Sequence, residues 1–307
     1  MAGAPKIRVI MDVDTGVDDA VALALATRLP ELDLIGVTTV AGNVDVEKTT
    51  ENSLRVLAAL GCSSIPVYRG MSRPLARAYH DAAEFHGVSG LGDAEFPPSP
   101  ASVQAETAPE FIVRTVREHP GEITLIPVAP LTNIAVALAL EPELPRLVKR
   151  VVIMGGAFLC PGNASRYAEY NIWADPEAAA IVANSKMPIT FIGLDVTHKA
   201  PMPKAVWESL AEREGVEAKM VYALSQRTFV GRRKNEFHLH DPLAVAVAAF
   251  PELVTTEVWG VTVETGIGDQ NGRTCLVQQP DASRHHVAVA VKADEFLARF
   301  GQALSLG

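Results

Sequence analysis

The sequence predicts an α/β fold, with a mainly parallel central sheet covered by helices in a Rossmann-like arrangement. Short runs rich in valine and isoleucine alternate with helical patterns along most of the chain. These runs are apolar throughout, which is typical of strands buried on both faces of a sheet. The 307 residues are 48% hydrophobic and show no linker or repeat. We therefore expect one domain over residues 1–307.

Strands and helices alternate in order through the first two thirds of the chain. Strands are expected at residues 7–11, 34–40, 65–67, 123–127, 151–154 and 189–193. Helices are expected between them, at residues 18–28, 46–60, 108–117, 131–140 and 176–185. After residue 200 helical patterns dominate through residue 250, and then come the strand-like segments EVWGVTVET and HHVAVAV and a last helix over 293–304. The alternation favours βαβ units and a parallel sheet.

Charge and cysteine content narrow the functional classes. The formal net charge is -9, and the one basic cluster, GRRK at 231–234, is short, so we expect no nucleic-acid partner. The chain has three cysteines, Cys62, Cys160 and Cys275. Because their number is odd and they are far apart in the sequence, they suggest free thiols in a reducing compartment. The start, MAGAPKIRVIMD, lacks a signal-peptide pattern, and the apolar run at 20–29 is shorter than the ~20 residues of a membrane span. We expect a cytoplasmic protein with no membrane partner.

Polar residues stand where several predicted strands end. Asp12 and Asp14 follow the first strand, and Asn43, in TTVAGN, follows the second. The segments PVAPLTN and GGAF follow the strands at 123–127 and 151–154. Because ligands of open parallel sheets bind outside the carboxyl ends of the strands, these polar segments predict an active site at that edge.

The segment VIMDVDTGVDDAVALALA crowds four aspartates between a strand and a helix: Asp12, Asp14, Asp18 and Asp19. Capping of the helix explains one or two of them. A divalent cation explains all four, and an all-oxygen set favours a hard ion, Ca²⁺ or Mg²⁺. An EF-hand is excluded, because the twelfth position of such a loop counted from Asp12 is Leu23 rather than glutamate.

Two distant segments add polar side chains. GNASRYAEYNIWADPEAA places Asn163, Glu169 and Asn171 in a loop before a helix, and HLHDPLAVAVAAF places His240 and Asp241 at the start of another helix. A helix cap followed by proline explains Asp241 alone, and a loop histidine explains His240 alone. Neither explanation accounts for all of these polar loops together.

The residues leave a second enzymatic interpretation open. DVDT after a strand is also typical of phosphatases of the haloacid dehalogenase type, in which Asp12 would be the nucleophile and Asp14 the acid/base. This interpretation gives Asp18 and Asp19 no role. It also needs a later lysine and acidic pair that have no clear counterpart in the sequence.

The motifs together resemble those of the nucleoside hydrolases, the inosine-uridine preferring family. The similarity runs in order from residue 7 to about residue 247 through DVDTGVDDA, TTVAGN, EFHGVSGLG, PVAPLTNIA, VVIMGGA, GNASRYAEYNIWADPEAA, GLDVTH and HDPLAV. The resemblance implies hydrolysis of the N-glycosidic bond of ribonucleosides, giving ribose and a free purine or pyrimidine base. It also implies one Ca²⁺ per chain and a homodimer or homotetramer.

The resemblance implies a role for each matching residue. The metal ligands would be Asp14, Asp19, Asp241 and the backbone carbonyl of Val128, and Asp18 would be the general base. Asp12 would support the cluster from behind. The ribose would be held by the following residues: Asp18, Asn43, Met154, Asn163, Glu169, Asn171 and Asp241. His86 and His240 would lie near the base, with His240 as the candidate acid.

These residue types suit the implied chemistry. Glycosidic cleavage develops positive charge on the sugar, which carboxylate and amide oxygens stabilise. A bound cation lowers the pKa of water, and a histidine can protonate the leaving base. A non-catalytic nucleoside-binding protein remains a third interpretation, although binding alone needs neither an acid nor a base.

The segment QRTFVGRRKNEFHLH, just before HDP, is the least certain part of the predicted site. It lacks the tyrosines of some inosine-uridine members, so it leaves the preferred base open. Arg232 or Arg233 would reach a carbonyl of the base, or the segment would form a solvated basic turn, which is the expectation that we favour.

Overall fold

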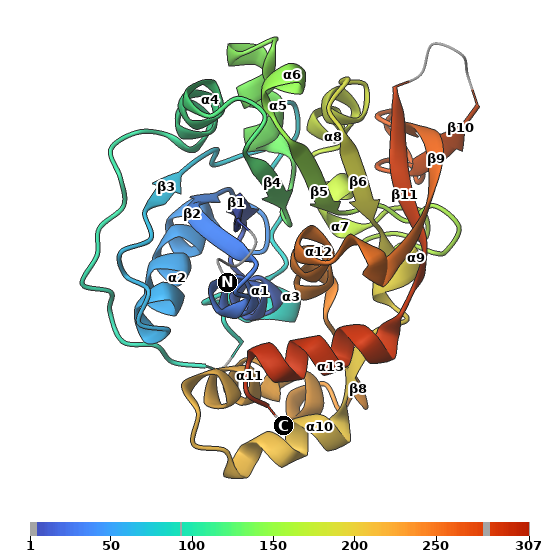
Figure 1. Cartoon of the computed structure of the whole chain (residues 1–307). Helices are drawn as coiled ribbons and strands as arrows, with labels where there is room; N and C mark the ends of the chain where they lie inside the picture. Colours follow the sequence, from blue (N-terminus) through green and yellow to red (C-terminus); the bar gives the residue numbers. More distant parts are fainter. Residues whose placement is uncertain (1–4, 93, 279–282, 307) are drawn as a thin grey trace.

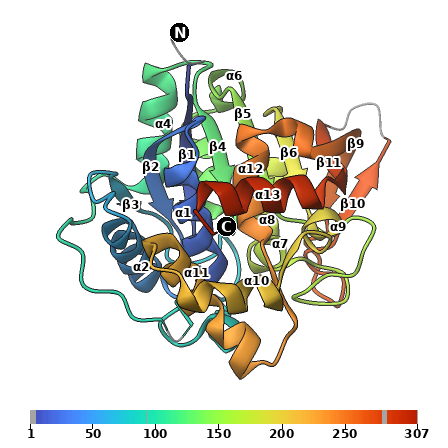
Figure 2. The ribbon, with the colours of Figure 1, turned by 60° about the horizontal axis from the view of Figure 1, so that its bottom comes forward.

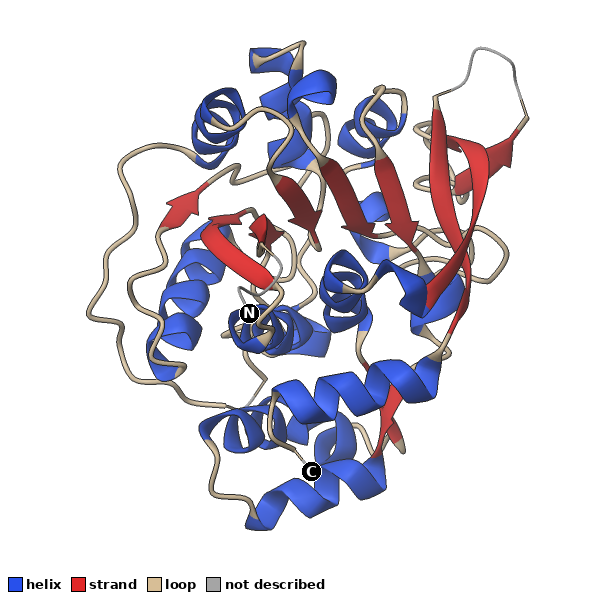
Figure 3. Ribbon diagram, in the orientation of Figure 1, coloured by secondary structure: helices blue, strands red, loops and turns tan. Residues whose placement is uncertain are grey.

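A computed structural model describes residues 5–92, 94–278 and 283–306, and these form a single α/β domain around one large sheet (Figures 1 and 3). The strands of this sheet are β1 (Ile7–Val13), β2 (Leu32–Thr39), β3 (Val67–Arg69), β4 (Thr124–Pro127), β5 (Arg150–Met154), β6 (Ile189–Ile192), β9 (Val254–Val263), β10 (Thr274–Val277) and β11 (Arg284–Val291). Their order across the sheet is β10-β9-β11-β6-β5-β4-β1-β2-β3.

The sheet is mainly parallel, as predicted. All strands from β3 across to β11 pair in parallel, and β9 runs antiparallel to both of its neighbours, β11 and β10, at one edge. The order 3-2-1-4-5-6 is that of a doubly wound fold, in which the direction of strand addition reverses between β1 and β4. Ligands of such folds bind beyond the carboxyl ends of the strands at that reversal.

Helices cover both faces of the sheet, and Figure 2 shows α13 lying across α1 and α12. One layer contains α1 (Val17–Arg28), α2 (Val46–Ala59), α11 (Val216–Gln226), α12 (His240–Ala249) and α13 (Ala293–Ala303). The other contains α4 (Ala108–Glu118), α5 (Thr132–Leu140) and α8 (Pro176–Ala183). Alternate residues of β1 enter the two cores, with Val9 and Met11 in the first and Ile10 in the second. This two-sided burial explains why the strands are apolar throughout.

Short elements connect these layers. They are α3 (Ala83–His86), α6 (Leu144–Leu147), α7 (Tyr170–Ala174), α9 (Leu194–Thr197), α10 (Lys204–Ser209), η1 (Leu210–Glu212), the π-helix η2 (Arg227–Gly231), η3 (Pro251–Leu253) and the two-stranded antiparallel sheet of β7 (Pro201–Pro203) and β8 (Glu236–His238). Across the described part of the chain, every helix falls short of the length and apolar character that a bilayer crossing requires.

Two alanine-rich helices, α1 and α12, pack against each other, and this contact brings their amino termini to the same place. In α1 every residue from Asp19 to Ala26 is buried, and in α12 every residue from Asp241 to Ala248 is buried. Small side chains at a contact allow a short distance between helix axes. The acidic residues of both amino termini therefore meet at the edge of the sheet.

The structure corrects some predicted elements. The third strand runs from Val67 to Arg69, not over 65–67, because Pro66 has no N–H for the ladder and the backbone N–H of Ile65 donates to Cys62 within a turn. The strand β10 and the small β7–β8 sheet were not predicted. Each is only three or four residues long, and prolines confine β7 to a sheet edge.

One buried carboxylate, that of Asp175, joins three segments on the far side of the sheet. It accepts hydrogen bonds from the Ala178 N–H at 3.1 Å, from the Thr132 hydroxyl at 2.6 Å and from the Leu75 N–H at 2.9 Å. It is fully buried and caps α8. Removing it leaves several buried donors without an acceptor.

We therefore expect Asp175→Ala to lower the free energy of unfolding by about 2–4 kcal/mol, since a lost cap and unpaired buried donors add together. The matched control is Asp45→Ala, which removes a more exposed cap that receives the Lys48 N–H of α2 and should lower it by about 1 kcal/mol. Urea denaturation of both variants measures the difference. Equal losses would contradict the structural role of Asp175.

Candidate functional site

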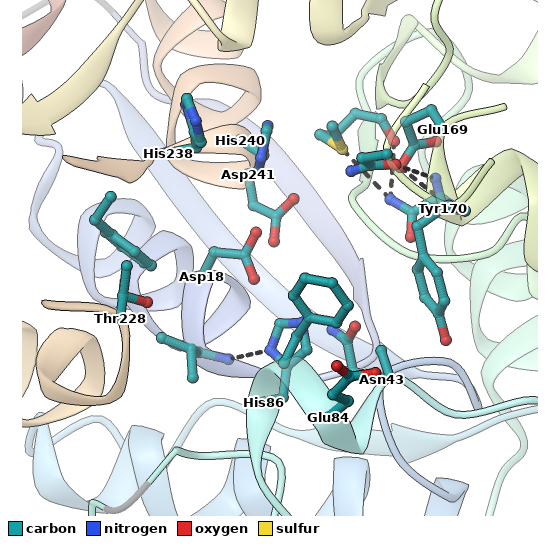
Figure 4. Close-up of a pocket in the computed structure, with 18 of the residues that line it drawn as sticks. Asp18, Asn43, Glu84, His86, Glu169, Tyr170, Thr228, His238, His240 and Asp241 are labelled. Atoms are coloured by element: carbon teal, nitrogen blue, oxygen red, sulfur yellow. Dashed lines mark hydrogen bonds between the residues drawn. The ribbon is translucent and has the colours of Figure 1, made fainter. Parts of the chain in front are cut away.

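A cavity of about 510 Å³ opens beyond the carboxyl ends of the central strands, at the reversal point between β1 and β4. Figure 4 shows residues from distant segments converging on it. Most of the residues predicted for the site line this cavity: Asp18, Asn43, His86, Val128, Met154, Asn163, Glu169, Asn171, His240 and Asp241. The fold therefore brings together the loops that the motifs singled out.

Below the cavity, Asp19 organises the turn between β1 and α1. Its Oδ1 accepts the Asp14 N–H at 3.0 Å, and its Oδ2 accepts both the Gly16 N–H and the Asn43 side-chain amide at 3.0 Å. The Asn43 N–H donates in turn to Asp14 Oδ2 at 2.7 Å. The loop after β2 is thus hydrogen-bonded to the loop after β1, and backbone and amide N–H groups hold the two carboxylates in place.

Gly16 is required where these groups approach most closely. A Cβ at Gly16 would lie 2.4 Å from His86 Nδ1 and 2.6 Å from Asn43 Nδ2. The backbone N–H of Val17 donates to His86 Nδ1 at 3.1 Å, the bond drawn in Figure 4. Since this nitrogen accepts, a neutral His86 carries its proton on Nε2. Burial lowers the pKa of His86, which favours the neutral form.

The carboxylates of Asp18, Asp19 and Asp241 converge, each with an oxygen within 4.8 Å of the others. Asp14 Oδ1 is buried and accepts no hydrogen bond. Among the described residues, no lysine or arginine donates a hydrogen bond to any of these carboxylates. Oxygen ligands with unused lone pairs fit a hard divalent cation.

The pKa values show how unfavourable this cluster is without a cation. Burial, with Asp18 nearby, raises the pKa of Asp19 to about 7. Burial also raises the pKa of Asp14 and of Asp241 well above the usual range, with repulsion from Asp19 and from Asp18 respectively as the next cause. Desolvation and like charge both oppose ionisation. A bound cation would reverse both effects.

Asp12 lies behind the cluster, outside the lining of the cavity. Its Oδ1 accepts the Thr38 hydroxyl at 2.6 Å and the Asn133 amide at 2.7 Å, so it ties β1 to β2 and α5. Burial raises its pKa to about 7. A nucleophile must face its substrate, so this placement argues against the phosphatase interpretation and fits a supporting residue. The PVAPLTN motif contained Asn133, but its spacing did not reveal this contact.

A second wall comes from the loop before α7. Both oxygens of the Glu169 carboxylate are bound by backbone N–H groups, those of Gly156, Asn171 and Ile172. Burial raises the pKa of Glu169 to about 7. The Asn171 amide donates to the carbonyls of Val128 at 3.0 Å and Met154 at 3.2 Å. A carbonyl oxygen has two lone pairs, so Val128 can still bind a cation.

Tyr170, which was not predicted, joins this wall to the aspartate loops. Its N–H donates to Asn163 Oδ1 at 2.9 Å, and its hydroxyl donates to the Gly42 carbonyl at 2.9 Å. The residue next to the predicted Glu169 therefore fixes the position of Asn163. Only its place inside a motif indicated a role.

Three histidines form the opposite wall: His198, His238 and His240, with ring centroids 4.9–5.6 Å apart. The Nδ1 of His240 lies 2.8 Å from the Thr197 hydroxyl. Burial, together with the neighbouring His238 and His198, lowers the pKa of His240. His198 and His238 lie within the motifs GLDVTH and HLHDP, but neither was predicted as a site residue.

The basic segment contributes to the rim. The Arg232 guanidinium lies 4.0 Å from the ring centroid of Phe85, and both residues line the cavity. Both Arg232 and Arg233 are exposed, and Arg233 does not line the cavity. Arg232 is exposed, which is consistent with the expectation of a solvated turn, and it also forms a cation–π contact that joins the residue after η2 to α3.

Known proteins similar to this chain act on nucleosides. The family model described as inosine-uridine preferring nucleoside hydrolase matches residues 9–298. The chain is 38% identical over 297 residues to an inosine-uridine preferring nucleoside hydrolase of Leishmania major, covering 94% of each chain. It is 42% identical over 262 residues to a pyrimidine-specific ribonucleoside hydrolase of Shewanella oneidensis, covering 84% of this chain and 82% of that protein.

A solved structure shares the fold. The purine-preferring ribonucleoside hydrolase from Gardnerella vaginalis superposes with a TM-score of 0.91 at 35% sequence identity, over 97% of this chain and 98% of that chain. Similarity therefore extends over nearly the whole length of both molecules.

The raised carboxyl pKa values predict how the metal-free protein responds to pH. The pKa of Asp12 and that of Asp19 are each raised from 3.8 to about 7 by folding. Between about pH 4 and pH 7 the folded state therefore binds more protons than the unfolded state. Stability should then fall as pH rises through this range, by about 1.4 kcal/mol per pH unit for each such proton. Urea denaturation after chelation measures this slope. A divalent cation should raise stability more at pH 7.5 than at pH 5, and a pH-independent effect would contradict the cluster as its site.

Proposed function

Because this chain belongs to the inosine-uridine preferring nucleoside hydrolase family and is an N-glycosidase of ribonucleosides, we propose that its cavity holds a ribonucleoside above one Ca²⁺. The observation that carries this proposal is the convergence of Asp18, Asp19 and Asp241 from the amino termini of two helices. The unused oxygen of Asp14 lies buried in the same cluster. Asp14, Asp19, Asp241 and the Val128 carbonyl would hold the cation.

When bound, Ca²⁺ would orient the ribose hydroxyls and lower the pKa of water. The C1′–N bond breaks with its electron pair going to the base, and a bond forms between C1′ and the oxygen of water. Asp18, which lines the cavity, accepts the proton of that water. The remaining carboxylates stabilise the positive charge that develops on the sugar.

The ribose would lie between the two loop walls. Asn43 and Asn163 both line the cavity, and each is already oriented by hydrogen bonds to the protein. Glu169 and Asn171 are held by backbone partners in the same way. Met154 provides an apolar contact at the end of β5. Side chains fixed in advance lose little entropy when substrate binds.

The base would lie toward His86, His240 and the Phe85–Arg232 pair at the rim. His240 would protonate the departing base, and it regains a proton from solvent before the next turnover. Relatives of this chain are named for inosine and uridine, for pyrimidines and for purines. We propose that the rim segment, residues 225–239, together with α3, selects the base.

A panel of inosine, adenosine, guanosine, uridine and cytidine tests the proposal, with free ribose as the readout and metal analysis of the same preparation. Release of ribose with one Ca²⁺ per chain supports it. Turnover that survives complete removal of divalent cations would reject the calcium role.

The cellular location and the oligomeric state are also proposals. The free state of Cys62, Cys160 and Cys275 supports a cytoplasmic location. The homodimer or homotetramer implied by the family resemblance can be tested by light scattering.

Asp18→Asn should lower kcat by about 10²–10⁴-fold or more, since it removes a general base and a negative charge while keeping the shape. The far-UV spectrum and melting temperature should stay close to those of the wild type. Asp33→Asn, an exposed change at the opposite end of β2, is the matched control and should leave kcat unchanged. Retention of more than about a tenth of the wild-type kcat by Asp18→Asn would reject its role as the base.

His240→Ala should lower kcat on natural nucleosides by about 10²–10⁴-fold, because their bases leave poorly without a proton. Hydrolysis of 4-nitrophenyl riboside should largely survive, since nitrophenoxide leaves without one. The effect should fall on kcat more than on KM. If both substrates suffer equally, His240 acts by positioning Asp241 instead, and His86 becomes the candidate acid.

A further inference from the structure

The strand β10 and the turn before it contact the two loops that hold the Glu169 carboxylate. In Figure 1, β10 is the outermost strand at one edge of the sheet. Three successive residues make the contacts: Gly272, Arg273 and Thr274. They were not predicted as site residues, and they do not line the cavity. Their contacts reach the loop after β5 and the loop before α7.

The Thr274 side chain binds both backbone polar groups of one residue in the loop after β5. Its hydroxyl oxygen accepts the Ala157 N–H at 3.0 Å, and its hydroxyl hydrogen is donated to the Ala157 carbonyl at 3.0 Å. Thr274 and Ala157 are both buried. A hydroxyl can donate and accept at the same time, so this one side chain satisfies a buried peptide donor and a buried peptide acceptor.

The residue just before Ala157 binds the proposed ribose ligand. The Gly156 N–H donates to Glu169 Oε2 at 3.2 Å. Gly156 has a φ of +95°, which glycine adopts readily and other residues rarely do. Because glycine is also the most flexible residue, its N–H keeps one direction only if its neighbours are fixed. Thr274 fixes the neighbour on the carboxyl side.

The rest of this loop has anchors of its own. Asp195 accepts the N–H groups of Phe158 at 2.9 Å and Leu159 at 2.7 Å. Among the described residues, the hydrogen bonds to the Ala157 backbone come from Thr274 alone. Loss of the Thr274 hydroxyl would therefore loosen the loop beside the Glu169 contact and leave its far end in place.

The two residues before Thr274 contact the loop before α7. A Cβ at Gly272 would lie 2.7 Å from Trp173 Cα and 3.2 Å from Ala168 Cβ, and the φ of Gly272 is +76°. The hairpin backbone therefore lies directly against this loop. The Arg273 guanidinium lies 5.6 Å from the ring centroid of Tyr167. These contacts fix the start of β10 relative to the loop that carries the ribose-binding carboxylate.

We propose that Thr274 is a positioning residue, which holds Ala157 so that the Gly156 N–H stays on Glu169 and fixes the carboxylate that binds ribose. This inference rests on the proposed role of Glu169. The Thr274 hydroxyl bonds the loop backbone and lies outside the lining of the cavity. Its effect should therefore appear on the sugar side, for every substrate that contains ribose and whatever the leaving group.

The test compares Thr274→Val, which keeps the shape and removes the hydroxyl, with Thr274→Ser, which keeps the hydroxyl. Three constants are measured on the calcium-loaded enzyme: KM for the best nucleoside of the panel, KM for 4-nitrophenyl riboside, and the Kd of free ribose from NMR titration. Thr274→Val should raise all three by about fivefold, the factor that corresponds to one lost hydrogen bond. Thr274→Ser should keep them close to those of the wild type.

A matched control and a double-mutant cycle separate positioning from general damage. Thr262→Val changes a half-buried threonine of β9 in the same hairpin, and it should leave the three constants unchanged. Glu169→Gln should raise the same constants by itself. Adding Thr274→Val to Glu169→Gln should then change them little, because residues that act through one contact are not additive.

The outcomes distinguish this inference from the proposed function. If Glu169→Gln raises the Kd of ribose but Thr274→Val does not, or if the two changes are fully additive, the role of Thr274 is overturned while that of Glu169 stands. A lower melting temperature with an unchanged Kd of ribose would show a merely structural threonine. If Glu169→Gln leaves the Kd of ribose unchanged, both roles are rejected. If the wild type releases no ribose from any nucleoside, the proposed function fails, and the Kd of ribose still decides the role of Thr274.

Discussion

Mutual repulsion among buried carboxylates is the constraint on which the rest of this structure depends. Asp14, Asp19 and Asp241 are removed from water, and within the described part of the chain no lysine or arginine donates a hydrogen bond to their carboxylates. Their charge is stabilised in part by the amino termini of α1 and α12 and by the donors of Asn43. The alanine-rich contact between the two helices is what brings those termini together. In the proposed function, a bound cation would balance this negative charge.

Near the proposed position of the base, hydrogen bonds rather than charges orient the side chains. His86 is oriented by a backbone N–H and His240 by a threonine hydroxyl, so each presents its other ring nitrogen independently of the metal site. In the proposed reaction, the carboxylates would stabilise the positive charge of the sugar, whereas the histidines would act on the negative charge of the leaving base.

The family relationship helps to explain where specificity arises. Relatives named for purines, for pyrimidines and for inosine and uridine share the fold of this chain. In the proposed function, the aspartate cluster would contact the sugar, which these substrates have in common. The rim is built from short elements, α3 and the π-helix η2, joined by side-chain contacts such as that of Arg232 with Phe85. Such contacts can change without disturbing the sheet.

The sequence by itself determined the alternation of strands and helices, the parallel sheet and the motifs whose side chains line the cavity, because periodicity and residue type act over a few neighbouring positions. It also indicated a support behind the cluster at Asp12. Tertiary structure alone decided that Asn133 binds Asp12, that Tyr170 fixes Asn163, that Thr197 meets His240 and that Arg232 reaches the rim. These pairs join distant segments of the chain. Their contacts depend on how helices and loops pack on the sheet, and no local pattern records that packing.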